Sequence, residues 1–343
     1  MNTRYEKNFS KIQKCAYSLI QSDAKLIITL YLSKNKKLKS NYFCMFLPYL
    51  AIFSYGAENW GKKMKLPTPL FNGSEKRFYS KVRQNHKFFD NDYNAMKQAL
   101  AREYKKADSY FFSNMSLCST ITGVYYNVGV DTFNNKYCGN TVLISFYLPD
   151  YNYNYNYGKK MKTLSEVAGK LSAFYLYDDF SFYKYDVDAE SDSLDINFED
   201  NPILNGNSID ILCYFSIICS INFIIEFIDK LFVEEIPQKL KYAYIIYYYL
   251  CNLIEDINSI DNISLEIDSS YINSDFRNCI AHYGLGQVMK EEDIIEDDIL
   301  FGLTNKIFNI GYSEFKNIIY KELYSVRNQI ENIIIRKWKQ WIK

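Results

Sequence analysis

Apolar residues recur every three or four positions along much of this chain, which is the spacing of one face of an α-helix. The pattern predicts helices over residues 8–33, 40–56, 75–110, 208–233, 238–256 and 274–283, and a last helix that begins near Ser313. The last helix has one continuous apolar stripe, formed by Phe315, Ile319, Leu323, Val326, Ile330, Ile334 and Trp338. We therefore expect the second half of the chain to form an up-and-down bundle of about four helices.

The ends of these helices have their own sequence signals. Ser208 or Asp210 is expected to cap the helix over 208–233, and Pro237 suits the first turn of the next helix. The candidate caps of the short helix are Ser274 and Asp275, and Gly284 and Gly286 are expected to mark its end or a bend.

The pattern changes after Cys118. The stretches ITGVYYNVGV and TVLISFYL are rich in β-branched and aromatic residues, and FNNKYCGN between them has turn chemistry, so we expect a hairpin or small meander. The tract YNYNYNYG at 151–158 is either an exposed strand edge, a tyrosine-rich loop or, beside Lys159, Lys160 and Lys162, a surface that stacks on nucleic-acid bases.

An acidic segment divides the 343 residues of the chain. DVDAESDSLDINFED at 186–200 has seven acidic side chains in fifteen positions, and Asn201, Pro202 and Gly206 follow it. A chain of this length commonly forms two domains. The predicted fold class is mainly α, with a basic α+β domain over residues 1–200 and a helical bundle over residues 201–343.

Charge is distributed unevenly between the two segments. Residues 1–185 carry 27 Lys and Arg against 13 Asp and Glu, whereas residues 186–343 carry 13 against 27, so their formal charges are +14 and −14. Two interpretations follow: a basic surface that meets a polyanion, or two halves that neutralise each other.

The chain lacks the motifs that are usual in several functional classes of protein. With two histidines and no C-x-x-C pair, the chain has no standard zinc or redox motif, and it has no glycine-rich nucleotide loop and no GxSxG, so we expect no metal and no cofactor. The N-terminal MNTRYEKNFSKIQK is polar, and the apolar stretch from Ile211 to Ile225 is shorter than the roughly 20 residues that span a bilayer. We therefore expect a cytoplasmic protein with free thiols, a buried helix at this stretch and no membrane contact.

One segment carries residue types suited to phosphate chemistry. In DFRNCIAHYGLG at 275–286, four residues separate Arg277 from His282, and Asn278 directly follows the arginine. Arginine stays charged and matches phosphate oxygens, and histidine exchanges a proton near neutral pH. Residues five apart on a helix are rotated by about 140° and displaced by about 7.5 Å, so both side chains can reach a phosphate that lies across them.

This segment resembles the Arg-x(4–6)-His motif of the HEPN ribonucleases, with the Arg-Asn opening that is frequent there. Two apolar helices precede it and a long amphipathic helix follows, so the resemblance covers roughly residues 203–340. It implies a HEPN-like bundle and a metal-independent endoribonuclease, in which the 2′-OH of RNA attacks and leaves a 2′,3′-cyclic phosphate. The implied catalytic residues are Arg277, Asn278 and His282.

The resemblance also implies partners. RNA is the substrate, and a homodimer formed through the C-terminal bundle would place Arg277 and His282 of both subunits in one cleft. Such enzymes act in toxin–antitoxin, abortive-infection and other antiphage systems, so a regulatory or antitoxin protein is a further expected partner. The N-terminal 200 residues resemble no family, and we expect them to sense a trigger, bind RNA or restrain the nuclease.

Other interpretations stand beside this one. In one alternative, the protein is a non-catalytic HEPN-like module that binds RNA or a partner protein. In another, it is an oligomerising scaffold whose basic half meets an acidic protein. In a purely structural interpretation Arg277 pairs with Asp275 or Glu255, and His282 only ends a helix, where the helix dipole favours its protonated form. Tyr283 is expected to pack rather than to contact substrate.

The second histidine lies outside the motif. His86 follows Arg83 by three residues and Arg77 by nine, and neither spacing fits. We expect His86 to be an ordinary residue of a basic helix.

Overall fold

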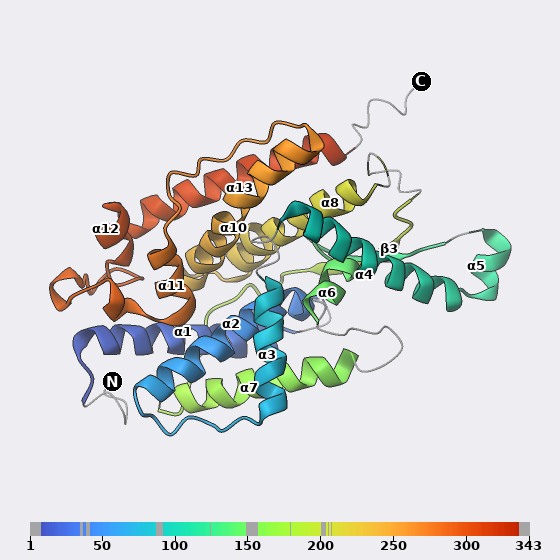
Figure 1. Cartoon of the computed structure of the whole chain (residues 1–343). Coiled ribbons are helices and arrows are strands. Elements are labelled where there is room, and N and C mark those ends of the chain that lie inside the picture. Colours follow the sequence, from blue (N-terminus) through green and yellow to red (C-terminus); the bar gives the residue numbers. More distant parts are fainter. Residues whose placement is uncertain are drawn as a thin grey trace.

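A computed structural model describes residues 8–34, 37–38, 42–86, 92–123, 125–148, 157–178, 180–199, 204, 206 and 208–335. In this part of the chain the fold is mainly helical, as the sequence predicts, with one small sheet of three antiparallel strands (Figure 1).

The first half contains α1 (Lys11–Ser33), α2 (Tyr42–Lys63), α3 (Gly73–His86), α4 (Tyr93–Ser113), α5 (Leu117–Thr122), β1 (Val128–Phe133), β2 (Lys136–Asn140), α6 (Thr141–Tyr147), α7 (Tyr157–Tyr175) and β3 (Ser191–Ile196). The second half contains α8 (Ile209–Asn222), the π-helical turn η3 (Phe223–Ile228), α9 (Asp229–Leu231), α10 (Pro237–Asp261), α11 (Ser274–His282), the short 3₁₀ turns η4 (Leu285–Gln287) and η5 (Glu291–Asp293), α12 (Leu303–Phe308) and α13 (Tyr312–Ile334).

The long apolar helix is a core element, as predicted. Ser208 caps α8 by accepting a hydrogen bond from the backbone N–H of Ile211, and the helix continues through η3 into α9. The prediction that this apolar stretch is too short to span a membrane is wrong, because the segment Ile209–Leu231 is long and apolar enough; however, 94% of its most apolar window is buried inside the protein. Burial on all sides explains why its apolar residues follow no single face.

The sheet corrects several sequence predictions. β1 and β2 form a hairpin in the expected region, but β2 lies inside FNNKYCGN, which was predicted as the turn, and the turn itself is only Asn134 and Asn135, which adopt positive φ. TVLISFYL was expected to be a strand but forms α6, because the Asn140 side chain accepts a hydrogen bond from the N–H of Leu143 and caps a helix there. The acidic segment predicted as a boundary contains β3, which pairs with the other edge of β1.

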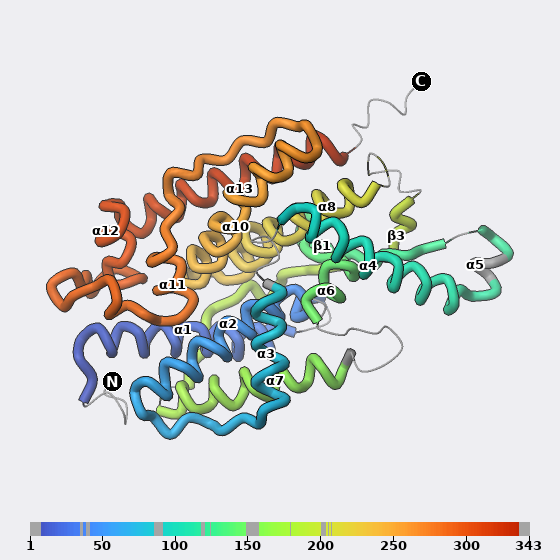
Figure 2. The backbone as a smooth tube through the Cα atoms, in the orientation of Figure 1, coloured from blue at the N-terminus to red at the C-terminus, as the bar shows by residue number. Residues whose placement is uncertain are grey.

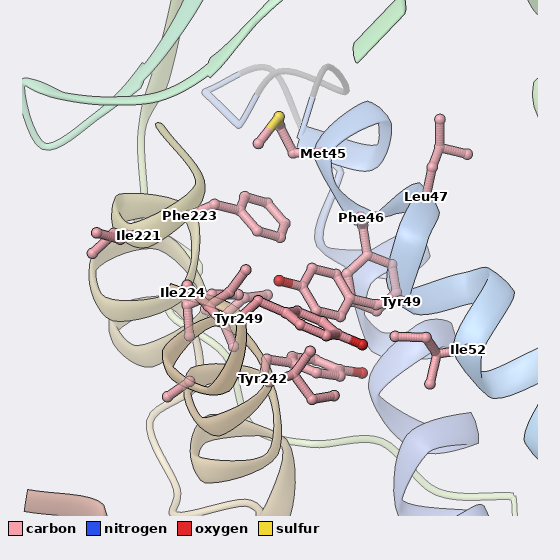
Figure 3. Packing of buried hydrophobic residues seen from close by; sticks show 14 of the residues in the cluster. Met45, Phe46, Leu47, Tyr49, Ile52, Ile221, Phe223, Ile224, Tyr242 and Tyr249 are labelled. Carbon is pink, nitrogen blue, oxygen red and sulfur yellow. The ribbon is translucent and has the colours of Figure 1, made fainter. Parts of the chain in front are cut away.

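Aromatic side chains join the two halves of the chain in the core. Figure 3 shows α2 facing the C-terminal helices, with Tyr49 directed toward Tyr242 and Phe223. The ring centroids of Tyr49 and Tyr242 are 4.2 Å apart, and Tyr49 also stacks against Phe223 at 6.2 Å. One cluster of buried apolar residues runs through both halves of the chain. The division into domains at residue 200 stays a prediction.

The C-terminal helices follow the sequence closely except at their caps. The six stripe residues of α13 from Phe315 to Ile334 are buried, and Trp338 lies outside the described residues. The cap of α13 is Gly311 rather than Ser313. Figure 2 shows α12 and α13 lying along one side of the molecule, with α11 between them and α1.

Part of the charge asymmetry is compensated inside the protein. Lys97 of α4 pairs with Asp210 at 2.5 Å and Asp261 at 2.9 Å, and Lys136 of β2 lies 3.8 Å from Glu331 of α13. The YNYNYNYG tract lies outside the described residues up to residue 156, so its three interpretations stay open.

Candidate functional site

The motif helix α11 is fixed at its start by a side-chain cap and a buried tyrosine. Asn273, rather than the expected Ser274 or Asp275, is the cap, and its side chain accepts a 2.8 Å hydrogen bond from the N–H of Phe276. The hydroxyl of Tyr244 on α10 bonds the N–H of Asn273 at 2.9 Å and the carbonyl of Tyr271 at 2.9 Å. This arrangement sets where α11 begins relative to α10.

The end of α11 is fixed by Tyr283, which adopts the left-handed conformation at φ 59°. Its side chain is 1% exposed, so it packs, as predicted, and its hydroxyl donates to the buried carboxylate of Asp23 on α1. Lys241 of α10 also donates to Asp23, and so does Gln238, at 2.8 Å. The helix therefore ends at Tyr283 and not at Gly284 or Gly286.

A glycine lets α2 approach the end of α11. A Cβ at Gly56 would lie 2.8 Å from the Tyr283 ring and 3.0 Å from the carbonyl oxygen of Ala281, closer than real side chains pack. Only glycine therefore permits this contact without movement of the motif helix.

The three motif residues point to two different hollows, which follows from helix geometry. Asn278 and His282 are four residues apart and share a face, whereas Arg277 is rotated from His282 by about 140°. Asn278 and His282 line an open pocket of about 530 Å³ between α1, α2 and the end of α11. Arg277 and His282 line a small cavity of about 20 Å³ on the other side.

Arg83 of α3 lines the same small cavity, with Ile52, Ile245, Tyr249 and Ala281 forming the rest of its wall. His282 thus lies between the open pocket and two guanidinium groups. The structure brings Arg277 and His282 together as the motif predicts, and it places Asn278 on the pocket side of the histidine.

Aromatic rings hold the two guanidinium groups. The Cζ atom of Arg83 lies 3.8 Å from the centre of the Tyr55 ring, and that of Arg277 lies 5.1 Å from the centre of the Tyr248 ring. The Tyr55 ring also packs edge-on against His282 with centroids 5.8 Å apart. A neutral ring attracts a cation without cancelling its charge.

No carboxylate of the described residues forms an ion pair with Arg83 or Arg277. The pairing of Arg277 with Asp275 or Glu255, which the structural interpretation expects, is therefore absent from the described residues, whereas His282 does end α11, as that interpretation also expects. The Nε atoms of both arginines and Nδ1 of His282 are buried and have no hydrogen-bond partner among the described residues. Buried polar groups are normally bonded, so three unpaired ones around one cavity mark a place that a ligand would complete.

The surroundings keep His282 neutral. Its pKa is lowered from 6.5 to about 4, by burial first and then by the positive charges of Arg83, Lys241 and Arg277, in that order. Both causes disfavour the imidazolium form, so the ring is a proton acceptor at neutral pH in the absence of a bound anion. Burial and the neighbouring cations therefore outweigh the helix dipole, which was expected to favour protonated His282.

Arg83 is the residue that the sequence did not reveal. It lies 194 positions before Arg277, and the histidine nearest to it in the sequence is His86, which ends α3. The available signal was weak: a basic segment, EKRFYSKVRQNHK, with aromatic residues between the charges. Only the packing of α3 and α11 on α2 brings Arg83 to the motif.

Among the described residues, no three His, Cys, Asp or Glu side chains are grouped so that they would hold a metal ion. The comparisons with known proteins add no further evidence: the chain matches no protein-family model, no curated protein and no solved structure.

Proposed function

We propose that this protein is a metal-independent endoribonuclease whose reactive groups are Arg83, Arg277 and His282. One observation carries the proposal: two guanidinium groups and a neutral imidazole surround one cavity, and among the described residues the guanidinium groups have no carboxylate partner and each of the three groups has a buried nitrogen without a hydrogen bond. Such a set binds an anion and accepts a proton, and the imidazolium that results can donate a proton to the leaving oxygen, which are the requirements of RNA cleavage by the 2′-OH.

The reaction balances with the groups present. His282 takes the proton of the 2′-OH, the 2′ oxygen forms a bond to phosphorus, and the bond from phosphorus to the 5′ oxygen breaks. Arg83 and Arg277 stabilise the negative charge that gathers on the phosphate oxygens. The 5′ oxygen takes the proton from the imidazolium, so the products carry a 2′,3′-cyclic phosphate and a 5′-hydroxyl.

The low pKa of His282 has a role in this sequence. A neutral imidazole is ready to act as a base, and an anion between the guanidinium groups would offset the positive charge that holds the pKa down. Phosphate binding would therefore raise the pKa of His282 and favour the proton transfer. Asn278, on the pocket side, would orient the sugar or the imidazole.

The resemblance to the HEPN ribonucleases supports the same proposal and extends it. It adds a HEPN-like bundle over residues 201–343, a homodimer formed through that bundle, and a toxin or antiphage role in the cytoplasm. Arg83 supplies a second cation within one chain, where the resemblance implies that a partner subunit provides it. We therefore propose that each chain carries a complete set of charges, and that a dimer is not needed to provide them.

A second candidate function has its own observation in favour. The cavity between the guanidinium groups holds about one water molecule, so a phosphate enters only if side chains such as Tyr249 move. A site that stays closed fits a non-catalytic module that binds RNA or a protein through its outer surface.

Product analysis separates the two functions. Purified protein would be incubated with a defined RNA in EDTA, beside the same RNA with a 2′-deoxyribose at the cleaved position. We expect cleavage in EDTA, ends with 2′,3′-cyclic phosphate and 5′-hydroxyl groups, and no cut at the deoxy position. Products with 5′-phosphates, or cleavage that requires magnesium, would contradict the mechanism. Binding without cleavage would support the second function.

A further inference from the structure

The open pocket beside His282 differs chemically from the small cavity that Arg83 and Arg277 line. Its wall comes from the start of α1, the end of α2 and the segment from α11 to η4. Its volume of about 530 Å³ falls within the range of pockets that bind small molecules. The proposed reaction uses only its edge, where Asn278 and His282 lie.

Carboxamide side chains dominate the polar part of this pocket. Among the described residues, four carboxamides and no carboxylate line it: Gln13, Asn59, Asn278 and Gln287. In the described part of the chain, the side chains of Asn59, Asn278 and Gln287 have no hydrogen bond. Each amide offers both a donor and an acceptor, which is how Asn and Gln recognise the edges of nucleobases.

The remaining wall matches the other parts of a nucleotide. Trp60, Ile12 and Met64 provide apolar surface for the faces of a base, and the exposed Lys63 is the one Lys or Arg among the described residues that line the pocket. A neutral group with many hydrogen-bonding atoms, joined to an anion, fits this combination better than an acidic or a purely apolar ligand does.

From this combination we infer that the pocket binds the base of the nucleotide next to the reactive phosphate, with Asn59 and Gln287 bonding its edge. The inference rests on the proposed ribonuclease function for the identity of the ligand. The shared wall at His282 then places the ribose of that nucleotide beside the imidazole. The pocket thereby determines which nucleotide is cut.

Binding of nucleoside 3′-monophosphates tests the pocket without any cleavage. Trp60 lines it, and the other two tryptophans are Trp338 and Trp341. Replacing those two by phenylalanine leaves Trp60 as the sole fluorescent indole. We expect each of the four common monophosphates, titrated in EDTA, to give a saturable change in its emission, with different affinities for different bases, and we expect calorimetry to return the same constants.

Variants locate the binding. Asn59→Ala and Gln287→Ala each remove one neutral hydrogen bond from an exposed side chain, so we expect affinity to fall by about 3- to 10-fold. Asn305→Ala, an exposed asparagine of α12, is the matched control and should leave affinity unchanged. Unchanged affinity in both pocket variants, or inorganic phosphate giving the same response at the same concentration, would overturn the inference.

The two proposals fail separately. If nucleotides bind as described and no RNA is cut, the pocket stands and the ribonuclease function fails. If RNA is cut in EDTA but no monophosphate binds, the ribonuclease function stands and the pocket inference fails.

Discussion

Neutralising Arg83 should raise the pKa of His282. Arg83 is the strongest of the three charged causes of the low pKa, and burial is a larger cause than any charge. The substitution Arg83→Gln removes the charge and keeps a polar side chain. Burial remains, so the pKa should stay below its ordinary value of 6.5.

The size of the expected pKa change follows from the distance between Arg83 and His282, which two ring contacts bound. The Cζ atom of Arg83 lies 3.8 Å from the Tyr55 ring centre, and that ring lies 5.8 Å from the His282 ring, so the charge is within about 10 Å of the imidazole. At an effective dielectric constant of about 20, a unit charge at about 10 Å contributes about 1.7 kcal/mol, or slightly more than one pH unit. Arg83 is partly exposed, and water screens its charge, so we expect the pKa to rise from about 4 to about 5.

Nuclear magnetic resonance of isotope-labelled histidine measures the pKa of His282 directly. The chain has two histidines, so His86→Asn leaves His282 as the single reporter. Arg77→Gln is the matched control, because Arg77 is exposed on the same helix and does not line the cavity. Arg277→Gln should raise the pKa less than Arg83→Gln does. A midpoint near 6.5 in the parent protein, or no change in Arg83→Gln, would refute the reasoning.

Three further predictions concern stability and assembly. The pKa of His282 is about 4 in the folded protein and 6.5 when exposed, so the unfolded chain binds more protons between these pH values. The contribution of His282 to the free energy of unfolding should therefore fall by about 2 kcal/mol from pH 7 to pH 5. Urea unfolding of the parent and of His282→Gln at both pH values measures this contribution as their difference. Equal pH dependence in both proteins would contradict this. Asp23→Asn should lower the free energy of unfolding by about 3 to 5 kcal/mol at pH 7, because it leaves the Lys241 charge buried without its partner, and a loss below 1 kcal/mol would show that the pair is not intact. Mixing Arg277→Ala with His282→Ala protein should restore no cleavage, because each chain holds its own set of charges; recovered activity would show a site shared between subunits.

The helices of the second half could be predicted because their signals are local. The stripe of α13, the cap at Ser208 and Pro237 at the start of α10 each act within a few residues of sequence. The prediction of a strand at the position of α6 was wrong for a physical reason. A short run that is buried on most sides has no period, and β-branched residues alone do not distinguish a strand from a helix.

Only the site residues that lie close together in the sequence could be predicted. Arg277, Asn278 and His282 lie within one turn and a half of α11, so their spacing reveals them. Arg83 reaches the cavity through the packing of α3 on α2, and nothing near Arg83 in the sequence encodes that contact. The neutral state of His282 likewise arises from burial and from charges on two other helices, which spacing does not record.

Single-turnover cleavage of one RNA by alanine variants in EDTA tests the central claim most directly. If Arg83, Arg277 and His282 form one reactive site, Arg83→Ala and Arg277→Ala should each slow cleavage by about 100-fold or more, and His282→Ala by about 100- to 10,000-fold. The matched controls Arg77→Ala and His86→Ala should cut at the parent rate. Full activity in Arg83→Ala or His282→Ala, with the fold verified by circular dichroism, would contradict the account.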